Sequence, residues 1–188
     1  MNLTADIYLG RGVRLRTLTT QDVGLVVHAT GTETGRALWA AHPRGPYTPR
    51  DARAALESWD PDAGGQVSYG MVEHDRLLGA LGLMPDGPRS AELAYWVRPE
   101  SRRQGLALLG IHALTQWAHQ HAGLERIWLE INPDNLPSLR LADRAGYRFE
   151  QRIAHHCREW TAPDPCHDSW HDCLIWAHAE SGASSPVI

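Results

Sequence analysis

The amino-acid sequence predicts a single α/β domain, residues 1–188, in which helices cover both faces of a mixed, mostly antiparallel sheet of about seven strands. Three observations lead to this fold class. Short runs of alternating apolar and polar residues recur along the chain, as in half-buried strands. Three of these runs, between residues 66 and 97, are joined by short turns, as in an antiparallel meander. A helical segment separates the third run from a later one at 126–131, which indicates a right-handed crossover.

The first third of the chain is expected to form one strand and two helices. Apolar residues alternate with polar ones in residues 13–18, which predicts the strand. Thr48 followed by Pro49 is a typical start for the second helix. Thr19 or Thr20 is expected to cap the first helix, whose inward-facing residues are Leu25, Val26 and Ala29.

The central third supplies three strands and the longest helix. Strands 66–73 and 77–84 are expected to pair as a hairpin, and a further strand begins at Ser90 or Ala91. The helix that follows has an apolar stripe with the spacing of one buried face. We expect this stripe to lie on the sheet, and it consists of Leu106, Leu109, Gly110, Ala113, Leu114 and Trp117.

The last third is expected to add a strand at 126–131, a helix and two final strands at 147–157 and 170–177. Asn135 can cap the helix, and Gly146 can end it from the C′ position. Residues 179–188 are expected to form a flexible tail, because they are mostly small and polar.

Composition excludes several classes of protein. A formal net charge of -4 offers no general attraction to nucleic acid or to an anionic membrane. The sequence contains no secretion signal and no apolar run of the roughly 18 to 20 residues that span a bilayer. We therefore expect a cytoplasmic protein with no nucleic-acid or membrane partner, either monomeric or homodimeric. The three cysteines are an odd number at loose spacing, which argues against a disulfide framework.

The start of the longest helix has the features of a phosphate site. Gly105 opens this helix, so main-chain N–H groups and the positive end of the helix dipole are accessible to an anion. Arg102, Arg103 and Gln104 stand at the same point. No Gly-Lys-Ser/Thr tripeptide is present, which argues against a nucleoside triphosphate loop. The segment 105–110 resembles a dinucleotide fingerprint loosely, but the long segment before Gly105 and the antiparallel strands fit that fold poorly.

Four pieces of sequence, in order, carry a resemblance to a known family. Arg102-Arg-Gln-Gly-Leu-Ala107 matches the Arg/Gln-x-x-Gly-x-Gly/Ala signature of the GNAT superfamily of N-acetyltransferases. Residues 91–97 before it, and 132–139 and 144–149 after it, resemble the ribosomal-protein N-terminal acetyltransferase branch. The resemblance covers a core motif at 91–152 and is weak outside it.

The resemblance implies that acetyl-CoA is the cosubstrate and that no metal is needed. It implies main-chain contacts to the pyrophosphate, and pantetheine lying between the strands that start at Ala91 and Arg126. A main-chain N–H near Ala94 to Trp96 would polarise the thioester carbonyl. The implied cofactor-binding residues are Trp96, Val97, Arg102, Arg103, Gln104, Gly105, Leu106, Ala107, Leu108, Asn135 and Ser138.

The resemblance also implies two catalytic residues. Glu92 would be the base that removes a proton from the acceptor amine, although strand alternation alone also produces a solvent-facing glutamate. Ser138 matches the serine of the family's Asn-x-x-Ser, or is an ordinary residue of the first helical turn. Many relatives carry a tyrosine acid where this chain has Ala142. The thiolate is then protonated by Ser138, water or another residue, or it needs no dedicated acid.

The acceptor is expected to be a primary amine, either a protein N-terminus or a small molecule. The alternatives are an acyl-CoA-binding sensor without catalysis and an NAD-linked oxidoreductase. Trp39 and Trp59 are candidate walls of the acceptor cleft, with core packing as the other interpretation. The group Cys157, Cys166, His167, His171 and Cys173 lacks the paired spacing of a zinc knuckle, so no metal is expected there.

Overall fold

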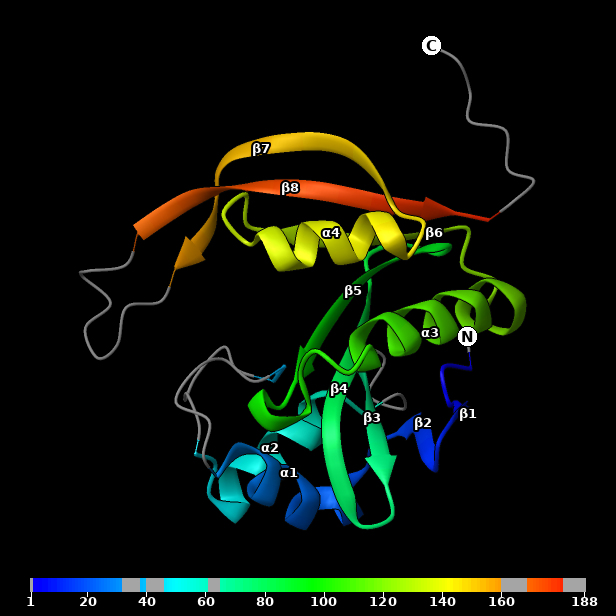
Figure 1. Cartoon of the computed structure of the whole chain (residues 1–188), viewed down its shortest axis with the longest axis vertical. Helices are drawn as coiled ribbons and strands as arrows, with labels where there is room; N and C mark the ends of the chain where they lie inside the picture. The colour runs from blue at the N-terminus through cyan, green and yellow to red at the C-terminus, as the bar shows by residue number, and fades with distance from the viewer. Residues whose placement is uncertain (1, 32–37, 40–45, 61–64, 160–168, 181–188) are drawn as a thin grey trace.

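The computed structural model describes residues 2–31, 38–39, 46–60, 65–159 and 169–180. Within those residues, eight strands form one sheet in the order β1-β2-β3-β4-β5-β6-β8-β7 (Figure 1). All neighbouring strands are antiparallel except β5 and β6. The predicted mixed α/β sheet is therefore confirmed. Its strands are β1 (Asp6–Gly10), β2 (Val13–Thr17), β3 (Val67–Glu73), β4 (Arg76–Pro85), β5 (Ser90–Val97), β6 (Arg126–Ile131), β7 (Arg148–Glu159) and β8 (Ser169–Ala179).

The sequence pattern predicted seven strands, and the additional strand in the structure is β1. It is five residues long and forms the edge of the sheet, where Tyr8 is 64% exposed. An edge strand that buries few side chains lacks the apolar alternation that identifies a strand. β1 is joined to β2 by a turn in which Gly10, Arg11 and Gly12 all have positive φ.

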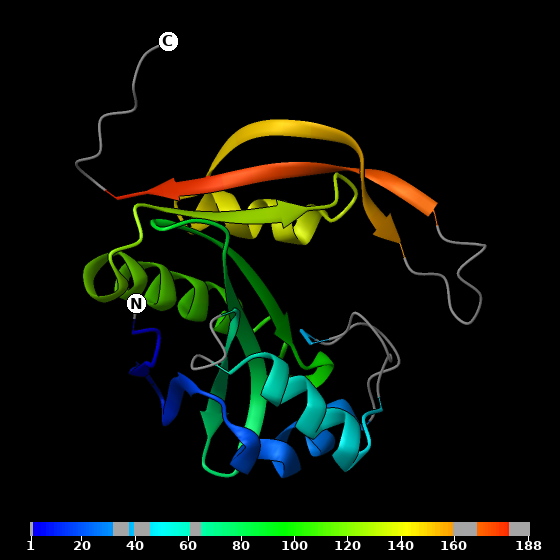
Figure 2. The same cartoon turned by 180° about the vertical axis from the view of Figure 1, so that it is seen from behind.

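Helices cover both faces of the sheet. Leu81 and Leu83 of β4 belong to one core together with residues of α3 (Leu106–Ala122) and α4 (Leu136–Arg144). Leu77 and Ala80 of the same strand belong to a second core with α1 (Val23–Thr30) and α2 (Pro49–Ser58). Short 3-10 helices, η1 (Thr20–Asp22) and η3 (Pro99–Ser101), precede α1 and α3. Figures 1 and 2 show α1 and α2 grouped together, away from α3 and α4.

The predicted caps of α2 and α4 are confirmed, whereas α1 has Asp22 as its N-cap, without a side-chain hydrogen bond. The side chain of Thr48 accepts a hydrogen bond from the main-chain N–H of Asp51. The side chain of Asp51 accepts one from the main-chain N–H of Thr48, which completes a capping box. Asn135 caps α4 by accepting a hydrogen bond from the N–H of Ser138 at 3.2 Å. Gly146, with φ 88°, follows the C-cap of α4. Thr19 caps η1, which leads into α1.

The predicted stripe of α3 was partly wrong. Leu109 is 44% exposed, and Ala113 and Trp117 are only half-buried. His119, which would be read as a surface residue, is buried, with Nδ1 2.5 Å from the carbonyl oxygen of Leu124. The buried face of the helix is therefore shifted from the predicted stripe towards Ile111, Thr115 and Ala118. The residues that α3 buries are Leu106, Gly110, Ile111, Leu114, Thr115, Ala118 and His119.

Trp39 and Trp59 belong to the second core rather than to the wall of a cleft. Each is 6% exposed, and the ring of Trp39 lies 6.4 Å from that of Trp96. Trp59 packs directly on β4 at Gly82, where an added Cβ would lie 2.1 Å from Cζ3 of the indole. The core-packing interpretation of these two tryptophans is confirmed.

We expect Gly82→Ala to lower the free energy of unfolding by about 1 to 3 kcal/mol, because the new methyl group overpacks a buried indole. Gly87→Ala is the matched control, since no atom lies within 4 Å of a Cβ at that position. Urea unfolding of both variants measures the difference. Equal stability of the two variants would contradict the packing of Trp59 on β4.

The sheet opens between β5 and β6. These parallel strands pair only at their first residues, where Ser90, Ala91 and Glu92 lie opposite Arg126, Ile127 and Trp128. Beyond Glu92, β5 continues along β4 as far as Val97, and β6 continues along β8. Figure 1 shows the two halves of the sheet diverging, with α3 and α4 next to the opening.

None of the helices in the described part of the chain has the length and hydropathy needed to cross a bilayer. The expected flexible tail lies largely outside the described residues, of which the last is Glu180. Cys166 and His167, named above among candidate metal ligands, also lie outside them.

Candidate active site

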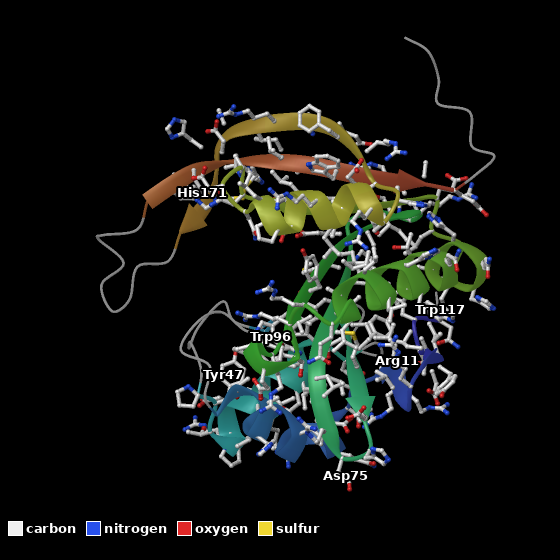
Figure 3. The ribbon with its side chains drawn as sticks, viewed as in Figure 1. Arg11, Tyr47, Asp75, Trp96, Trp117 and His171 are labelled. Atoms are coloured by element: carbon white, nitrogen blue, oxygen red, sulfur yellow. A yellow bond between two sulfur atoms is a disulfide. The ribbon has the colours of Figure 1, made fainter. Side chains whose placement is uncertain are left out.

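A cavity of about 680 Å³ lies where β5 and β6 diverge, between the end of β5, the start of α3 and the start of α4. Its walls come from segments far apart in the sequence. Figure 3 labels one lining residue, Trp96, which belongs to the end of β5. The lining residues are Tyr95, Trp96, Val97, Ser101, Arg102, Arg103, Gly105, Leu106, Ala107, Leu108, Asn135, Pro137, Ser138, Leu141 and Arg144.

The N-terminus of α3 forms one wall of this cavity. Gly105, the N-cap residue, has φ 79° and contributes no side-chain cap. The first intrahelical hydrogen bond of this turn runs from the N–H of Leu109 to the carbonyl oxygen of Gly105, at 3.0 Å. The N–H groups of the three preceding residues therefore have no acceptor within the helix. They belong to residues that line the cavity, so the positive end of the helix dipole meets it there.

Three arginines add positive charge to the cavity. Arg102, Arg103 and Arg144 line the cavity, and Arg144 was not identified from the sequence. Arg102 Nε donates a hydrogen bond to the carbonyl oxygen of Val97 at 2.9 Å, which connects the turn before α3 to the end of β5. Arg103 has φ 62°, a conformation that non-glycine residues seldom adopt. The cavity is thus suited to an anionic ligand.

The structure brings together nearly all of the predicted cofactor-binding residues. The exception is Gln104, which does not line the cavity and instead donates a hydrogen bond from Nε2 to the carbonyl oxygen of Glu100 at 3.2 Å. Five further lining residues were not predicted to be there, and they are Tyr95, Ser101, Pro137, Leu141 and Arg144. Pro137 and Leu141 lie on α4 beside Ser138, so they join the site through the position of that helix.

Tyr95 is a site residue, although the apolar pattern of its strand favours a packing role. Its hydroxyl donates a hydrogen bond to Ser138 Oγ at 2.7 Å, and both side chains line the cavity. Burial raises the pKa of the Tyr95 phenol, while its hydrogen bond to Ser138 opposes this effect. The phenol therefore stays protonated at neutral pH and orients the serine hydroxyl. Tyr147, by contrast, packs in the core, where its side chain is fully buried against Thr115.

Glu92 lies at the last paired position before the sheet opens, opposite Trp128. Burial is the largest cause that raises its pKa, to about 7, and the charges of Glu130 and Asp86 raise it further. Asp86 accepts a hydrogen bond from Trp128 Nε1 at 3.0 Å, which holds that charge near the site. A carboxyl group with this pKa can exchange a proton at neutral pH, as a general base must.

A family model described as an acetyltransferase (GNAT) domain matches residues 13–148. The chain belongs to the GNAT acetyltransferase family. The match includes the whole of the cavity, from Tyr95 to Arg144. The family and the mostly antiparallel sheet overturn the NAD-linked alternative, which requires a doubly wound parallel sheet.

This GNAT domain is 25% identical over 109 residues to the uncharacterized N-acetyltransferase YnaD of Bacillus subtilis (strain 168). The match spans 57% of this chain and 64% of YnaD, which is less than two thirds of that relative.

Solved structures show the same fold at low sequence identity. A RimL ribosomal L7/L12 alpha-N-protein acetyltransferase in complex with coenzyme A aligns with a TM-score of 0.79 and 16% identity, over 93% of this chain and 98% of that one. The ribosomal-protein-S5-alanine acetyltransferase from Vibrio fischeri aligns with a TM-score of 0.75 and 12% identity, over 96% and 100%. The microcin C7 self-immunity acetyltransferase MccE, in complex with acetyl-CoA and AMP, aligns with a TM-score of 0.76 and 14% identity, over 92% and 94%.

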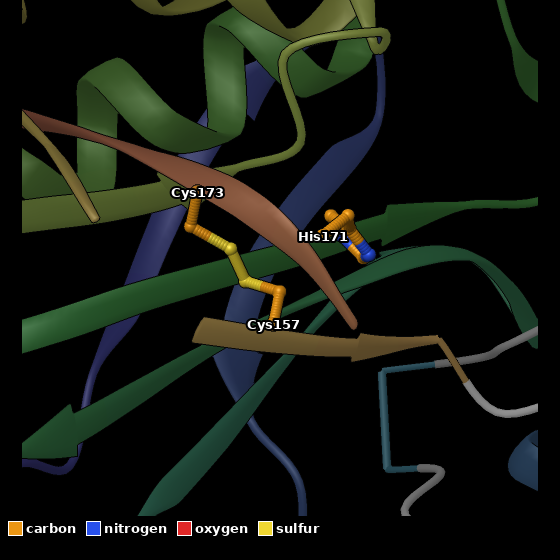
Figure 4. A group of neighbouring side chains, drawn as sticks. All are labelled: Cys157, His171 and Cys173. Atoms are coloured by element: carbon orange, nitrogen blue, oxygen red, sulfur yellow. A yellow bond between two sulfur atoms is a disulfide. The ribbon is translucent and has the colours of Figure 1, made fainter. Parts of the chain in front are cut away.

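The GNAT domain contains a cysteine pair that the sequence analysis argued against. Cys157 of β7 and Cys173 of β8 form a disulfide, with 5.9 Å between their Cα atoms (Figure 4). The expectation failed because the register of these two antiparallel strands brings together residues that are 16 apart in sequence. Spacing in the sequence does not report that register.

Proposed function

We propose that this GNAT domain is an acetyl-CoA-dependent N-acetyltransferase that transfers the acetyl group directly to a primary amine. The observation that carries the proposal is the juxtaposition of two features at the opening of the sheet. One is the cationic cavity at the open N-terminus of α3, and the other is Glu92, with a pKa raised to about 7, at the point where β5 and β6 part.

The cavity provides a place for each part of acetyl-CoA. The pyrophosphate is assigned to the main-chain N–H groups of residues 103–108, assisted by Arg102 and Arg103. Pantetheine is assigned to the gap between β5 and β6, where main-chain groups of β5 no longer have a partner strand on that side. A main-chain N–H near Trp96 would hydrogen-bond the thioester carbonyl oxygen and stabilise its developing negative charge.

Transfer removes two protons from an ammonium acceptor and supplies one to the sulfur. The first goes to Glu92, and the second leaves the nitrogen to water once the C–N bond has formed. Glu92 accepts a proton from the ammonium group of the acceptor, directly or through water, so that the neutral amine attacks the thioester carbon. The new C–N bond forms, the C–S bond breaks and the electron pair leaves on the sulfur of coenzyme A. Ser138 donates a proton to this thiolate, and Tyr95 is a positioning residue that holds the serine hydroxyl at 2.7 Å. This chain has Ala142, buried on α4, where many relatives carry a tyrosine.

Release of free coenzyme A thiol, measured over a panel of amines, tests the proposal. The panel contains peptides with free N-termini and small amines such as polyamines and aminoglycosides. Thiol release above hydrolysis with at least one amine, together with mass-spectrometric detection of the acetylated product, is the expected result. Tight acetyl-CoA binding without transfer to any member would favour the acyl-CoA sensor.

We expect Ser138→Ala to lower kcat by about 100-fold, the lower end of the range for general acid–base catalysis. Acetyl-CoA affinity should change little, because the serine hydroxyl acts on the leaving group. Ser138→Thr, which keeps a hydroxyl, should retain a large part of the rate. Steady-state kinetics and calorimetry measure these quantities, and an unchanged kcat in Ser138→Ala would remove Ser138 from the acid role.

Tyr95→Phe is expected to lower kcat by about 10-fold, since the serine hydroxyl loses the hydrogen bond that orients it. Tyr147→Phe is the matched control, because its hydroxyl contacts Thr115 in the core instead of the cavity. The control should alter stability and leave kcat unchanged. A similar loss of rate in both variants would argue for a general packing effect.

The proposal includes a cytoplasmic location, where acetyl-CoA is available, and a monomeric or homodimeric state. The acceptor is a primary amine on a protein N-terminus or on a small molecule. The structural likeness to acetyltransferases of ribosomal proteins favours testing N-terminal peptides first.

A further inference from the structure

Four potential metal ligands lie together on one face of the sheet, apart from the cavity. Cys157 and His171 are directly opposite each other in the β7–β8 pair, and Cys173 follows His171 two residues later, on the same face of β8. One ligand atom from each of these three residues lies within 4.8 Å of the others. Figure 4 shows the three side chains at the end of the β7–β8 ribbon, and Figure 3 shows His171 far from Trp96.

Glu130 of β6 brings a carboxylate to the same place. Its Oε1 atom lies 2.5 Å from Cys157 Sγ and 3.4 Å from Cys173 Sγ. Its other oxygen, Oε2, lies 3.5 Å from Nε2 of His156. A disulfide has no hydrogen to donate, so the Oε1 oxygen against two disulfide sulfurs would gain no hydrogen bond from them. Two thiols or a shared cation would give it one.

His171 provides a separate indication of a ligand. Its Nδ1 atom is buried and has no hydrogen-bond partner among the described residues. An unpaired buried nitrogen costs free energy, and this cost would be removed by coordination to a cation. Cys173, fully buried, presents its sulfur to the same point.

We propose that the reduced protein binds one zinc ion through Cys157, His171 and Cys173, with Glu130 as the fourth ligand. Two thiolates, one imidazole and one carboxylate form the tetrahedral donor set that zinc prefers, and the sulfur ligands select against magnesium and calcium. His156 then acts on the carboxylate that binds the metal, as an outer partner that orients it.

The sulfur atoms of Cys157 and Cys173 can either form the disulfide or bind zinc, but not both at once. Reduction by a dithiol reagent breaks the S–S bond with two electrons and two protons, and the reagent becomes a cyclic disulfide. Zinc binding then displaces the two thiol protons. The same strand register that permits the disulfide therefore also assembles the metal site, and only the reduced form has ligands to offer.

The test uses the full chain without a histidine tag, in a Cys166→Ser background, so that Cys157 and Cys173 are its only cysteines. The protein is reduced with dithiothreitol, freed of the reagent without oxygen, and titrated with Zn²⁺ and, separately, with Co²⁺. The expected result is one zinc per chain by elemental analysis and a sulfur-to-cobalt charge-transfer band in the near ultraviolet. The disulfide-bonded protein should bind at least about 100-fold more weakly.

Single substitutions then assign the ligands. His171→Ala and Cys173→Ser should each weaken zinc binding by at least about 10-fold, whereas His112→Ala, on the exposed face of α3, should not change it. Circular dichroism and the acetyl-CoA thermal shift confirm that each variant is folded. The proposal is overturned if the reduced background protein binds no zinc, if oxidised and reduced protein bind equally, or if His171→Ala binds as tightly as its parent.

Discussion

Gly105→Glu is expected to abolish measurable acetyl-CoA binding, with a loss of affinity of at least about 100-fold, or ~2.7 kcal/mol. The glutamate would place a negative charge at the N-terminus of α3, next to the N–H groups assigned to the pyrophosphate. Repulsion between the two anions and the bulk of the side chain act in the same direction. Isothermal titration calorimetry with acetyl-CoA measures the effect.

A matched control separates this effect from backbone strain. Gly105 has φ 79°, so any side chain there is strained. Gly123, with φ 67°, caps the other end of the same helix, and a Cβ there also meets no atom within 4 Å. Gly123→Glu should therefore cost similar stability and leave acetyl-CoA affinity unchanged. Normal acetyl-CoA binding by Gly105→Glu would refute the proposed pyrophosphate site.

Glu92→Gln is expected to lower kcat by about 100-fold or more while acetyl-CoA affinity stays nearly constant. Glutamine has almost the same size and shape as glutamate but cannot accept the proton of the acceptor amine. Glu92 does not line the cavity assigned to the cofactor, which is why binding should be spared. Turnover comparable to that of the parent would exclude Glu92 as the base.

The pKa of about 7 for Glu92 makes the rate depend on pH. The base acts only when ionised, so kcat/KM should rise with pH through a midpoint near 7 and level off above it. Glu92→Gln should lack this rise. Asp86→Asn removes one of the charges that raise this pKa, keeps an oxygen for the Trp128 indole, and should move the midpoint to lower pH. A pH profile that is the same in all three proteins would contradict the assignment.

The same pKa predicts a stability effect that is independent of catalysis. Because the folded-state pKa lies above the unfolded one, Glu92 favours the folded state fully below about pH 4.5, and this contribution is lost as pH rises through about 7. Glutamine resembles the protonated carboxyl group at every pH. The melting temperature of Glu92→Gln should therefore exceed that of the parent at pH 8 and equal it near pH 4.

Helix ends and turns could be predicted because their signals are local. Thr48, Asn135 and Gly105 each act on N–H groups a few residues away, so residue type and order are enough to place a cap or an open helix start. The family resemblance, carried by residues 91–152, lies in a continuous stretch for the same reason. The family match at 13–148 agrees with it.

Periodicity was less reliable for α3. An apolar residue at the right spacing, Leu109, is exposed, while the polar Thr115 and His119 are buried. The spacing of apolar residues shows which residues share one face of a helix. Which face packs on the sheet also depends on the volumes of the helix and sheet side chains that meet there. The strand β1 was missed because its pairing partner, and not its own composition, makes it a strand.

By itself, the sequence determined the fold class, the family, most caps of the helices and the open start of α3 at Gly105. Only the tertiary structure decided that Tyr95 reaches Ser138, that Glu92 lies at the opening between β5 and β6, and that Cys157, His171 and Cys173 meet. Caps and glycine turns arise from neighbours in the chain. These contacts instead depend on strand register and on the divergence of the sheet, which are set by packing between segments distant in sequence.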